Sequence, residues 1–405
     1  MTIENTSSID RRGFLKSAAA AASFTVLPAA TVASYAQNSK VELGLVGCGG
    51  RGKWIGRLFQ EMSDFKVVAL HDYFHDRLDR AAKELDVAKD RHYLGLDGYK
   101  ELIAGKVDAV AIESPPYFHP SQAIAAMQAG KHTYIAKPVA VDVPGCVAVL
   151  EAARAVKDKS VIIDFQTRNN EFYREAARRV HAGAIGAPVL GQCYYHCERL
   201  GKQCEPGTEL ARLRNWCFDI ALSGDIIVEQ NIHVIDVANW MINAHPEKAM
   251  GACGRKGRVD VGDCNDHFSV TFLYPDNVMV DFSSAQFIKG YSADLCMRLY
   301  GAEGTLDTHY GGMVCIDGDS KWPGGKTNTI YQDGAVNNIR DFHASIVEGK
   351  PINIVEDGVM SALTAILGRK AAYEQRMVTW EEMMADTTAL DAKLNLPADG
   401  PEQKC

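Results

Sequence analysis

A glycine loop that directly follows a short apolar run places the strongest constraint on the fold. The run covers residues 41–46, and the loop after it reads Gly47-Cys48-Gly49-Gly50-Arg51-Gly52. A helix-like segment begins at Lys53. In the order strand, loop and helix, Gly47 permits a tight turn, Gly49 lets backbone amides approach a pyrophosphate, and Gly52 lets helix and strand pack closely. The whole loop, with Gly50 and Arg51, therefore predicts a dinucleotide-binding site.

An acidic residue at the end of the next apolar run favours one dinucleotide over the other. Asp72 lies twenty positions after Gly52, where a carboxylate can accept hydrogen bonds from both hydroxyls of a ribose. The same carboxylate would face the 2′-phosphate of NADP, and two negative charges in contact repel each other. We therefore expect NAD as the cofactor, with NADP as the alternative.

Short apolar runs and amphipathic segments alternate along the first part of the chain. The runs cover residues 41–46, 66–71, 109–113, 132–135 and 160–165, and apolar residues recur at helical spacing over 120–129 and 144–156. This alternation predicts strands connected by helices around a parallel sheet. We therefore expect an α/β protein whose residues 40–166 form a Rossmann dinucleotide-binding domain.

The pattern changes after a helical stretch at residues 171–182. Longer β-rich runs follow at 188–197, 248–255, 267–274, 277–284 and 294–300, and two helices are expected, at 224–243 and 358–376. Strands with few helices between them favour antiparallel pairing. Residues 167–405 are therefore expected to form an α+β domain with an open, largely antiparallel sheet, which binds substrate and joins subunits into a homodimer or homotetramer.

The first 39 residues resemble an export signal followed by a linker. Arg11-Arg12-Gly13-Phe14-Leu15-Lys16 precedes an uncharged, Ala-rich stretch that ends near Ala36. This is the layout of a twin-arginine signal, which the export machinery reads. We expect cleavage after Ala36 and a periplasmic or extracytoplasmic protein. An uncleaved membrane anchor is the alternative, because the stretch approaches the roughly 20 residues that span a bilayer.

The remaining composition is that of a soluble protein that binds small molecules. The chain of 405 residues, 47% of them hydrophobic, can bury a sizeable core, and its net charge of -8 leaves no basic surface for nucleic acid. Cys193, Cys197 and Cys204, with His196, form a cluster that suggests metal ligands. Because no CxxC pair accompanies the cluster, we expect no metal.

Two further motifs follow predicted strands, at the edge where parallel sheets bind ligands. They read Ser114-Pro115-Pro116-Tyr117-Phe118-His119 and Ala136-Lys137-Pro138. Together with the glycine loop, Asp72, Arg168 and the segment at residues 232–236, these motifs resemble the glucose-fructose oxidoreductase, inositol dehydrogenase and rhizopine-catabolism family, written Gfo/Idh/MocA. The likeness covers nearly the whole chain after the predicted export signal.

The resemblance implies an NAD(P)-dependent oxidoreductase that acts on a sugar or cyclitol. It implies that Lys137 lies between nicotinamide and substrate, where its ammonium can hydrogen-bond the reacting hydroxyl. Glu229 lies four residues before His233, and an imidazole that titrates near neutrality suits proton removal from an alcohol. We expect further contacts to the cofactor from Ser114, Pro115, His119 and Arg168, and contacts to the substrate from Tyr117, Trp216 and Asp236. A solvated Lys137, and structural roles for His233 and Asp236, are the alternatives.

Two positions depart from the pattern that the resemblance implies. Glu229 stands where the family's dehydrogenases usually carry aspartate, and Ala136 stands where glutamate usually precedes Lys-Pro. The longer side chain of Glu229 could place its carboxylate differently. The loss of the glutamate leaves Lys137 without its expected neighbour and can change the pKa of the lysine. Simple alcohol dehydrogenation is therefore one hypothesis among several.

An exported enzyme cannot rely on a pool of free cofactor outside the inner membrane. We therefore expect a tightly bound dinucleotide that is regenerated within each catalytic cycle. In one scheme, one sugar is oxidised and a second is reduced. In the other, a hydroxyl is oxidised transiently, a neighbouring bond is eliminated or a centre is epimerised, and the hydride returns, as in the family's NAD-dependent glycosidases. A non-catalytic sugar-binding protein on the same scaffold is the third alternative.

Overall fold

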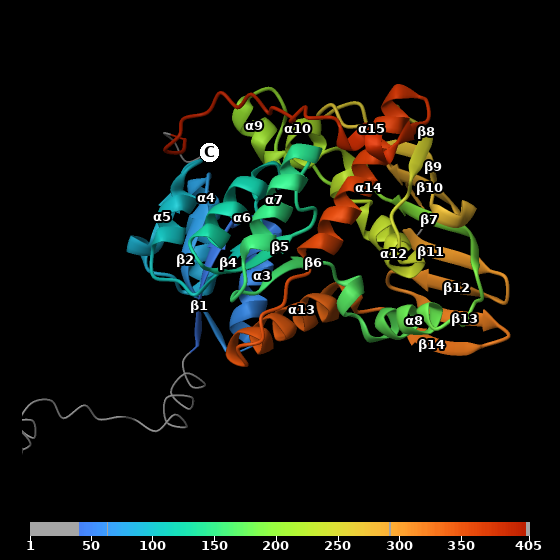
Figure 1. Ribbon diagram of the computed structural model, residues 1–405. Helices are drawn as coiled ribbons and strands as arrows, with labels where there is room; N and C mark the ends of the chain where they lie inside the picture. Colours follow the sequence, from blue (N-terminus) through green and yellow to red (C-terminus); the bar gives the residue numbers. More distant parts are fainter. Residues whose placement is uncertain (1–39, 63, 291–292, 402–405) are drawn as a thin grey trace, which may run out of the picture. The chain divides into compact units, whose positions relative to one another are not determined.

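The computed structural model describes residues 40–62, 64–290 and 293–401. The predicted export signal at residues 1–39 lies outside these ranges. From Lys40 onward the chain forms one unit, which Figure 1 shows in colour from blue to red. Within the described ranges, no helix is both long enough and apolar enough to cross a lipid bilayer.

In the described residues, six parallel strands form the first sheet. They are β1 (Val41–Val46), β2 (Phe65–Asp72), β3 (His92–Leu94), β4 (Ala109–Ile112), β5 (His132–Ala136) and β6 (Val161–Asp164), in the spatial order β3-β2-β1-β4-β5-β6. The connections hold α3 (Gly50–Glu61), α4 (His75–Leu85), α5 (Gly98–Ala104), α6 (His119–Gln128) and α7 (Val143–Ala155), with short 3-10 helices at Lys89–Arg91 and Pro116–Phe118. The strand order reverses between β1 and β4, where such sheets bind ligands. The predicted Rossmann fold is confirmed.

The second sheet has nine strands in the part of the chain that the structure describes. They are β7 (Pro188–Cys197), β8 (Lys248–Gly254), β9 (His267–Leu273), β10 (Met279–Gln286), β11 (Asp294–Gly301), β12 (Gly304–His309), β13 (Met313–Gly318), β14 (Trp322–Lys326) and β15 (Val378–Thr379). Among the described pairings β7 and β10 run parallel, and the other neighbours are antiparallel. The open, largely antiparallel sheet is therefore confirmed.

Helices cover one face of the second sheet. These are α8 (Glu171–His181), α12 (Ile232–Ile242) and α14 (Val355–Glu374), which pack on β7, β8, β9, β11 and β13. Along β10, Val280 and Phe282 are buried while Met279 and Asp281 are exposed. This alternation fits a sheet that packs on helices with one face only. The predicted homodimer or homotetramer stays a prediction.

The single helix predicted over residues 224–243 is wrong. The structure has α10 (Ile220–Ser223), α11 (Ile226–Glu229) and α12, after α9 (Glu209–Arg214) and a 3-10 helix at Trp216–Phe218. Between α11 and α12, the amide of Asn231 bonds to the carbonyl of Ile226, five residues back, and the side chain of Gln230 is held by Gln286. These contacts break the helix, so Glu229 ends one helix and His233 lies in the first turn of the next.

One helix from the predicted second domain packs into the core of the first sheet. This is α13 (Ile330–Val347), which lies beside α3 in Figure 1. Its Phe342 is fully buried, stacks on Phe65 with ring centroids 6.1 Å apart, and meets Tyr134 edge-on. The sequence boundary at residue 166 therefore does not separate the two cores. The last helix among the described residues is α15 (Trp380–Met384).

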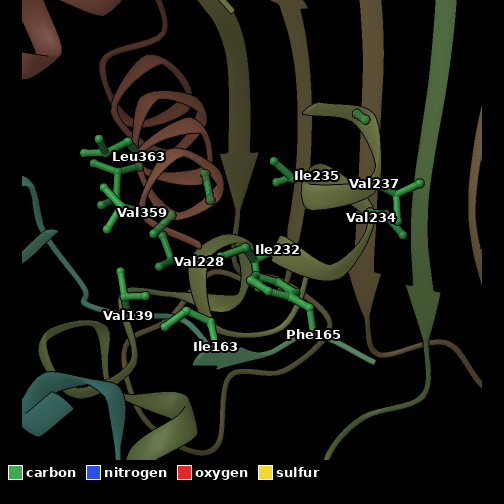
Figure 2. Packing of buried hydrophobic residues seen from close by; sticks show 14 of the residues in the cluster. Val139, Ile163, Phe165, Val228, Ile232, Val234, Ile235, Val237, Val359 and Leu363 are labelled. Carbon is green, nitrogen blue, oxygen red and sulfur yellow. The ribbon is translucent and has the colours of Figure 1, made fainter. Parts of the chain in front are cut away.

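A buried apolar cluster connects the carboxyl ends of the first sheet to the helices of the second. Figure 2 shows Ile163 and Phe165 from β6 and the residue after its end, packed near Val228 and Ile232 from α11 and α12. Side chains of α14, such as Leu363, join the same cluster. Closely packed apolar side chains resist displacement. The cluster therefore fixes α11 and α12 at the edge where β5 and β6 end.

Candidate functional site

The glycine loop after β1 has the geometry of a phosphate-binding turn. Gly47 has a φ of +91°, and a Cβ there would lie 2.6 Å from the backbone of Glu113. A Cβ on Gly52 would lie 1.8 Å from the carbonyl oxygen of Gly47. By contrast, a Cβ on Gly50 would meet nothing within 4 Å, and no side chain caps the start of α3. Open amides at a helix N-terminus attract an anion.

Asp72 at the end of β2 is held against this loop. Its Oδ2 accepts a hydrogen bond from the amide of Cys48, and its Oδ1 accepts one from the amide of Phe74, both at 2.8 Å. A carboxylate oxygen can accept a second hydrogen bond, so the pair of oxygens stays available for ribose hydroxyls.

The residues beside the loop line a pocket that we assign to the adenosine of the dinucleotide. Gly47, Asp72, Ser114 and Pro115, all predicted at the cofactor, contribute to its wall together with Tyr73, Phe74, Leu96, Phe118 and Leu213. Apolar and aromatic walls with a few fixed polar groups are typical of cofactor pockets. Open amides, a fixed carboxylate and an apolar pocket together fit a dinucleotide.

Lys137 and Glu229 form an ion pair where the two sheets meet. Lys137 follows β5 and Glu229 ends α11, and their side chains are only 11% and 14% exposed. The Lys137 Nζ donates to Glu229 Oε1 at 3.0 Å and also to the Glu229 carbonyl oxygen. Ala136 stands where a glutamate was expected next to Lys137. Glu229, from the second domain, provides the carboxylate partner of Lys137 instead. A solvated Lys137 is excluded by this burial.

His233 lies close to this pair in the first turn of α12. Its ring lies 6.2 Å from that of Phe165 and 6.0 Å from that of Tyr310, measured between centroids. Burial, with the cations of Lys137 and Arg51, lowers the pKa of His233 well below its usual range. The expectation that it titrates near neutrality is therefore wrong. Its Nδ1 is buried and has no hydrogen-bond partner among the described residues, so the neutral ring has a free nitrogen.

A buried charge cluster that the sequence did not indicate lies beneath the glycine loop. The Arg51 Nε lies 3.3 Å from Glu113 Oε2, and its Nη2 pairs with Asp164; both carboxylates are fully buried. The amide of Asn338, on α13, donates to Asp164 at 2.6 Å. The guanidinium of Arg51 is thus committed to two acids, while its backbone amide lies in the open first turn of α3, so the predicted contact of Arg51 with cofactor stays a prediction.

His119 connects the two motifs that follow β4 and β5. Its Nε2 lies 2.7 Å from the carbonyl oxygen of Ser114, and its Nδ1 lies 2.7 Å from that of Pro138. The residue is 1% exposed, and burial lowers the pKa of its ring to about 4. The neutral ring has one N–H and donates it to one of these two carbonyl oxygens, so His119 positions the motifs, and its expected contact with cofactor stays a prediction.

Arg168 and Asp236 form a buried ion pair and not a pair of ligand contacts. Arg168 donates from Nε and Nη2 to Asp236 at 2.9 to 3.0 Å, and Asp236, which is fully buried, also accepts from Ser361 at 2.6 Å. The second side of Arg168 pairs with Asp357 at 3.0 Å. The carboxylate and guanidinium are used up inside the protein, which corrects the predicted substrate contact of Asp236 and cofactor contact of Arg168.

The predicted substrate aromatics lie in a different place from the catalytic candidates. Tyr117 and Trp216 pack in the apolar cluster of Phe74 and Leu213, beside the adenosine pocket. Tyr310 instead lies beside His233, and Tyr331 accepts a hydrogen bond from Arg51 at 3.3 Å while 51% of it remains exposed. Tyr310 and Tyr331 come from segments far apart from the motifs, so no local signal marked them.

The thiols of the cysteine cluster make separate local contacts, and the expectation that they bind no metal stays a prediction. Cys193 contacts the carbonyl of Val234, Cys197 contacts Gln230, and Cys204 contacts the carbonyl of Ala211. Every cysteine within the described residues is free. The three thiols therefore serve different local contacts.

Two family models match the chain. Residues 41–165 match a model described as the oxidoreductase family with an NAD-binding Rossmann fold, and residues 173–307 match the GFO/IDH/MocA C-terminal domain. Together the two matches cover more than half of the chain.

Individual relatives and solved structures agree with these matches. The inositol 2-dehydrogenase of Burkholderia cenocepacia (strain HI2424) is 26% identical over 245 residues, which are 60% of this chain and 64% of that enzyme. The inositol 2-dehydrogenase of Acidothermus cellulolyticus is 26% identical over 272 residues, 67% of this chain and 73% of that enzyme. The chain thus spans slightly less than two thirds of the first relative's length.

The solved structures share the fold. A levoglucosan dehydrogenase in complex with NADH has a TM-score of 0.70 at 18% identity, with 84% of this chain and 99% of that chain covered. The apo scyllo-inositol dehydrogenase of Lactobacillus casei has a TM-score of 0.67 at 20% identity, with 85% and 99% covered.

Replacing Asp236 tests whether the ion pair with Arg168 is structural. Asp236→Ala leaves the largely buried guanidinium with only Asp357, and loss of one partner of a buried pair should lower the free energy of unfolding by about 3 kcal/mol. Asp357→Ala removes a carboxylate that is 55% exposed and should cost less than about 1 kcal/mol. Urea unfolding measures both, and equal small losses would contradict the structural role.

Proposed function

The chain belongs to the GFO/IDH/MocA oxidoreductase family, and from this premise we propose that it is an NAD-dependent oxidoreductase of a sugar or cyclitol. The observation that carries the proposal is the Lys137–Glu229 ion pair with the neutral His233 close by, at the edge of a Rossmann sheet. The inositol and levoglucosan dehydrogenases named above support the substrate class.

Each of the three residues has a distinct part in this reaction. A bound nicotinamide supplies the acceptor or donor of hydride. The ammonium of Lys137, held by Glu229, has a remaining N–H to donate to the reacting oxygen, and so stabilises the negative charge that develops there. The ring of His233, whose lowered pKa keeps it neutral, accepts the hydroxyl proton.

The role of Lys137 is tested by Lys137→Ala with Lys66→Ala, an exposed lysine on β2, as the matched control. Removing a proton donor from the reacting oxygen should lower turnover by about 10² to 10⁴, while binding of NAD stays within a few-fold of wild type. A panel of sugars and cyclitols analysed by mass spectrometry gives turnover, and calorimetry gives binding. Undiminished turnover in Lys137→Ala would rule out this mechanism.

A C-terminal segment, residues 386–401, covers the adenosine side of the cofactor pocket; we call it the strap. The amide of Leu96 donates to the carbonyl of Ala398 at 2.7 Å, and Arg212 donates to the carbonyl of Ala392 at 2.7 Å. Leu394 and Leu396 pack in the cluster of Phe74 and Leu213. In Figure 1 this segment runs from α15 past α9 toward the first sheet. Because Phe74, Leu96 and Leu213 also line the pocket, we infer that the strap hinders the release of a bound dinucleotide.

The strap supports a dinucleotide that stays bound through the catalytic cycle. A cofactor that does not exchange must be regenerated by the substrate itself, either by reduction of a second sugar or by return of the hydride after an elimination or epimerisation. The strap thus favours a second candidate function, a redox-neutral glycosidase, lyase or epimerase. The two candidates are distinguished by whether the sugar product is oxidised.

Removal of the strap tests this retention. Wild-type protein should keep its dinucleotide through dialysis, since a dissociation constant near 1 nM corresponds to about 12 kcal/mol of binding free energy. A chain truncated after Ala385 should lose it, and Leu394→Asp with Leu396→Asp should do the same without a deletion. Denatured samples assayed for NAD and NADP give the occupancy. Equal retention in all three proteins would show that the strap does not hold the cofactor.

We also propose export by the twin-arginine route, on the sequence of residues 1–39 alone. Replacing Arg11 and Arg12 together by lysine should trap the precursor in the cytosol, because that signal is read through its arginine pair. Lys16→Arg, which leaves the pair intact, is the control. Cell fractionation with immunoblotting measures the distribution, and unchanged export of the double variant would exclude this route.

A further inference from the structure

Glu113 is a buried acid that the proposed reaction does not use. It follows β4, whose pairing with β5 ends at Ile112 and Ile135, so Glu113 lies beside Ala136, the residue before Lys137. Its amide donates to the carbonyl of Val46 at 2.7 Å, and its backbone touches the turn at Gly47. Glu113 is thus in direct contact with the loop that would hold the dinucleotide.

The carboxylate of Glu113 is poorly compensated. It is fully buried, and neither of its oxygens has a hydrogen-bond partner among the residues that the structure describes. The charged and titratable groups that face it are Arg51, Asp164, Lys137 and Tyr134. Arg51 is shared with Asp164, which also accepts from Asn338, and Lys137 is bound by Glu229.

Two consequences follow from this environment. Burial raises the pKa of Glu113 to about 8, so the side chain can exchange a proton at physiological pH. An additional positive charge nearby would favour the ionised form. The oxidised nicotinamide ring carries such a charge, and Lys137, which the proposed function places beside that ring, faces Glu113. The reduced ring is neutral.

We propose that Glu113 is the charge-compensating acid of the cofactor site, ionised while the bound nicotinamide is oxidised and protonated when it is reduced. The proposal rests on the proposed function, because it requires that the glycine loop binds NAD. It assigns to Glu113 a preference for one redox state of the cofactor and not a contact with the substrate.

The proton and electron balance of the oxidation step is closed. The hydrogen on the alcohol carbon leaves with its electron pair to the nicotinamide, and the hydroxyl proton leaves through His233. Glu113 takes up one proton. In sum, an alcohol, the oxidised dinucleotide and a carboxylate become a ketone, the reduced dinucleotide and a carboxylic acid. The return of the hydride reverses each change, so a redox-neutral cycle needs no net proton from solvent.

The affinities of the two redox states, measured across a pH range around 8, test the proposal. Protein stripped of dinucleotide with charcoal is titrated with NAD⁺ and with NADH by calorimetry. Glu113 has one pKa in the NAD⁺ complex and a higher one in the NADH complex. At a pH below both values it is protonated in both complexes and contributes no preference for either redox state. As pH rises through this window, preference for NAD⁺ should rise by up to about tenfold per pH unit and then level off once Glu113 is ionised in both complexes.

Glu113→Gln should abolish this pH dependence and hold the ratio of the two affinities, at every pH, near the value that wild type has at low pH. Asp225→Asn is the matched control, because Asp225 is also a buried acid with a raised pKa but lies among Asn265 and Tyr373 of the second domain. It should keep the wild-type slope. A slope that persists in Glu113→Gln would overturn the proposal.

A measurement on wild type alone covers the case in which Glu113→Gln does not fold. Near pH 8, binding of NAD⁺ should release protons from Glu113, and calorimetry in two buffers of different ionisation enthalpy counts them. Binding without proton release would overturn the proposal. Absence of any binding by NAD⁺ and NADH would instead contradict the proposed function, so the two failures are distinct.

Discussion

The contact between Lys137 and Glu229 is the interaction on which the site depends. It joins a residue that follows a strand of the first sheet to the end of a helix in the second, and both charges are largely withdrawn from water. Breaking such a pair leaves a buried charge without a partner. The apolar cluster around Ile163 and Ile232 holds the two elements in position. The ion pair therefore fixes the position of the Lys137 ammonium because the apolar cluster holds both elements rigidly.

Charged groups in this protein divide into those that hold the scaffold and those that remain open to chemistry. Arg168 and Asp236 saturate each other, and the ring of His119 lies between two carbonyl oxygens. His233 and Glu113 instead keep polar atoms without hydrogen-bond partners in the described structure, and Glu113 has only its ion pair with Arg51. An unpartnered buried polar atom costs stability, and such costs concentrate at functional sites. Whether a buried polar group has its hydrogen bonds made therefore distinguishes candidate site residues from structural residues better than residue type does.

Much of the fold could be predicted from the sequence, because alternation of apolar runs and the glycine turn are local signals. The Rossmann sheet, the open antiparallel sheet and the pocket formed by Gly47, Asp72 and Ser114 all follow from such signals. The break between α11 and α12 was missed because it depends on Gln230 meeting a distant strand. The glycine loop predicts Arg51 at the cofactor, and its two acid partners have no signal near it in the sequence because they lie at the ends of other strands. Contacts between segments that are distant in the sequence leave no periodic pattern of residues, so the sequence does not predict them.

In the sequence, the strap lies after all the residues that line the pocket, the last of which is Leu213. During synthesis the glycine loop, Asp72 and the apolar wall are therefore complete while the pocket is still uncovered. A dinucleotide present in the cytosol could bind before residues 386–401 are synthesised, and the strap would then fold beside it. Loading of the cofactor in this order would be part of biosynthesis, and it would need no later opening of the mature protein.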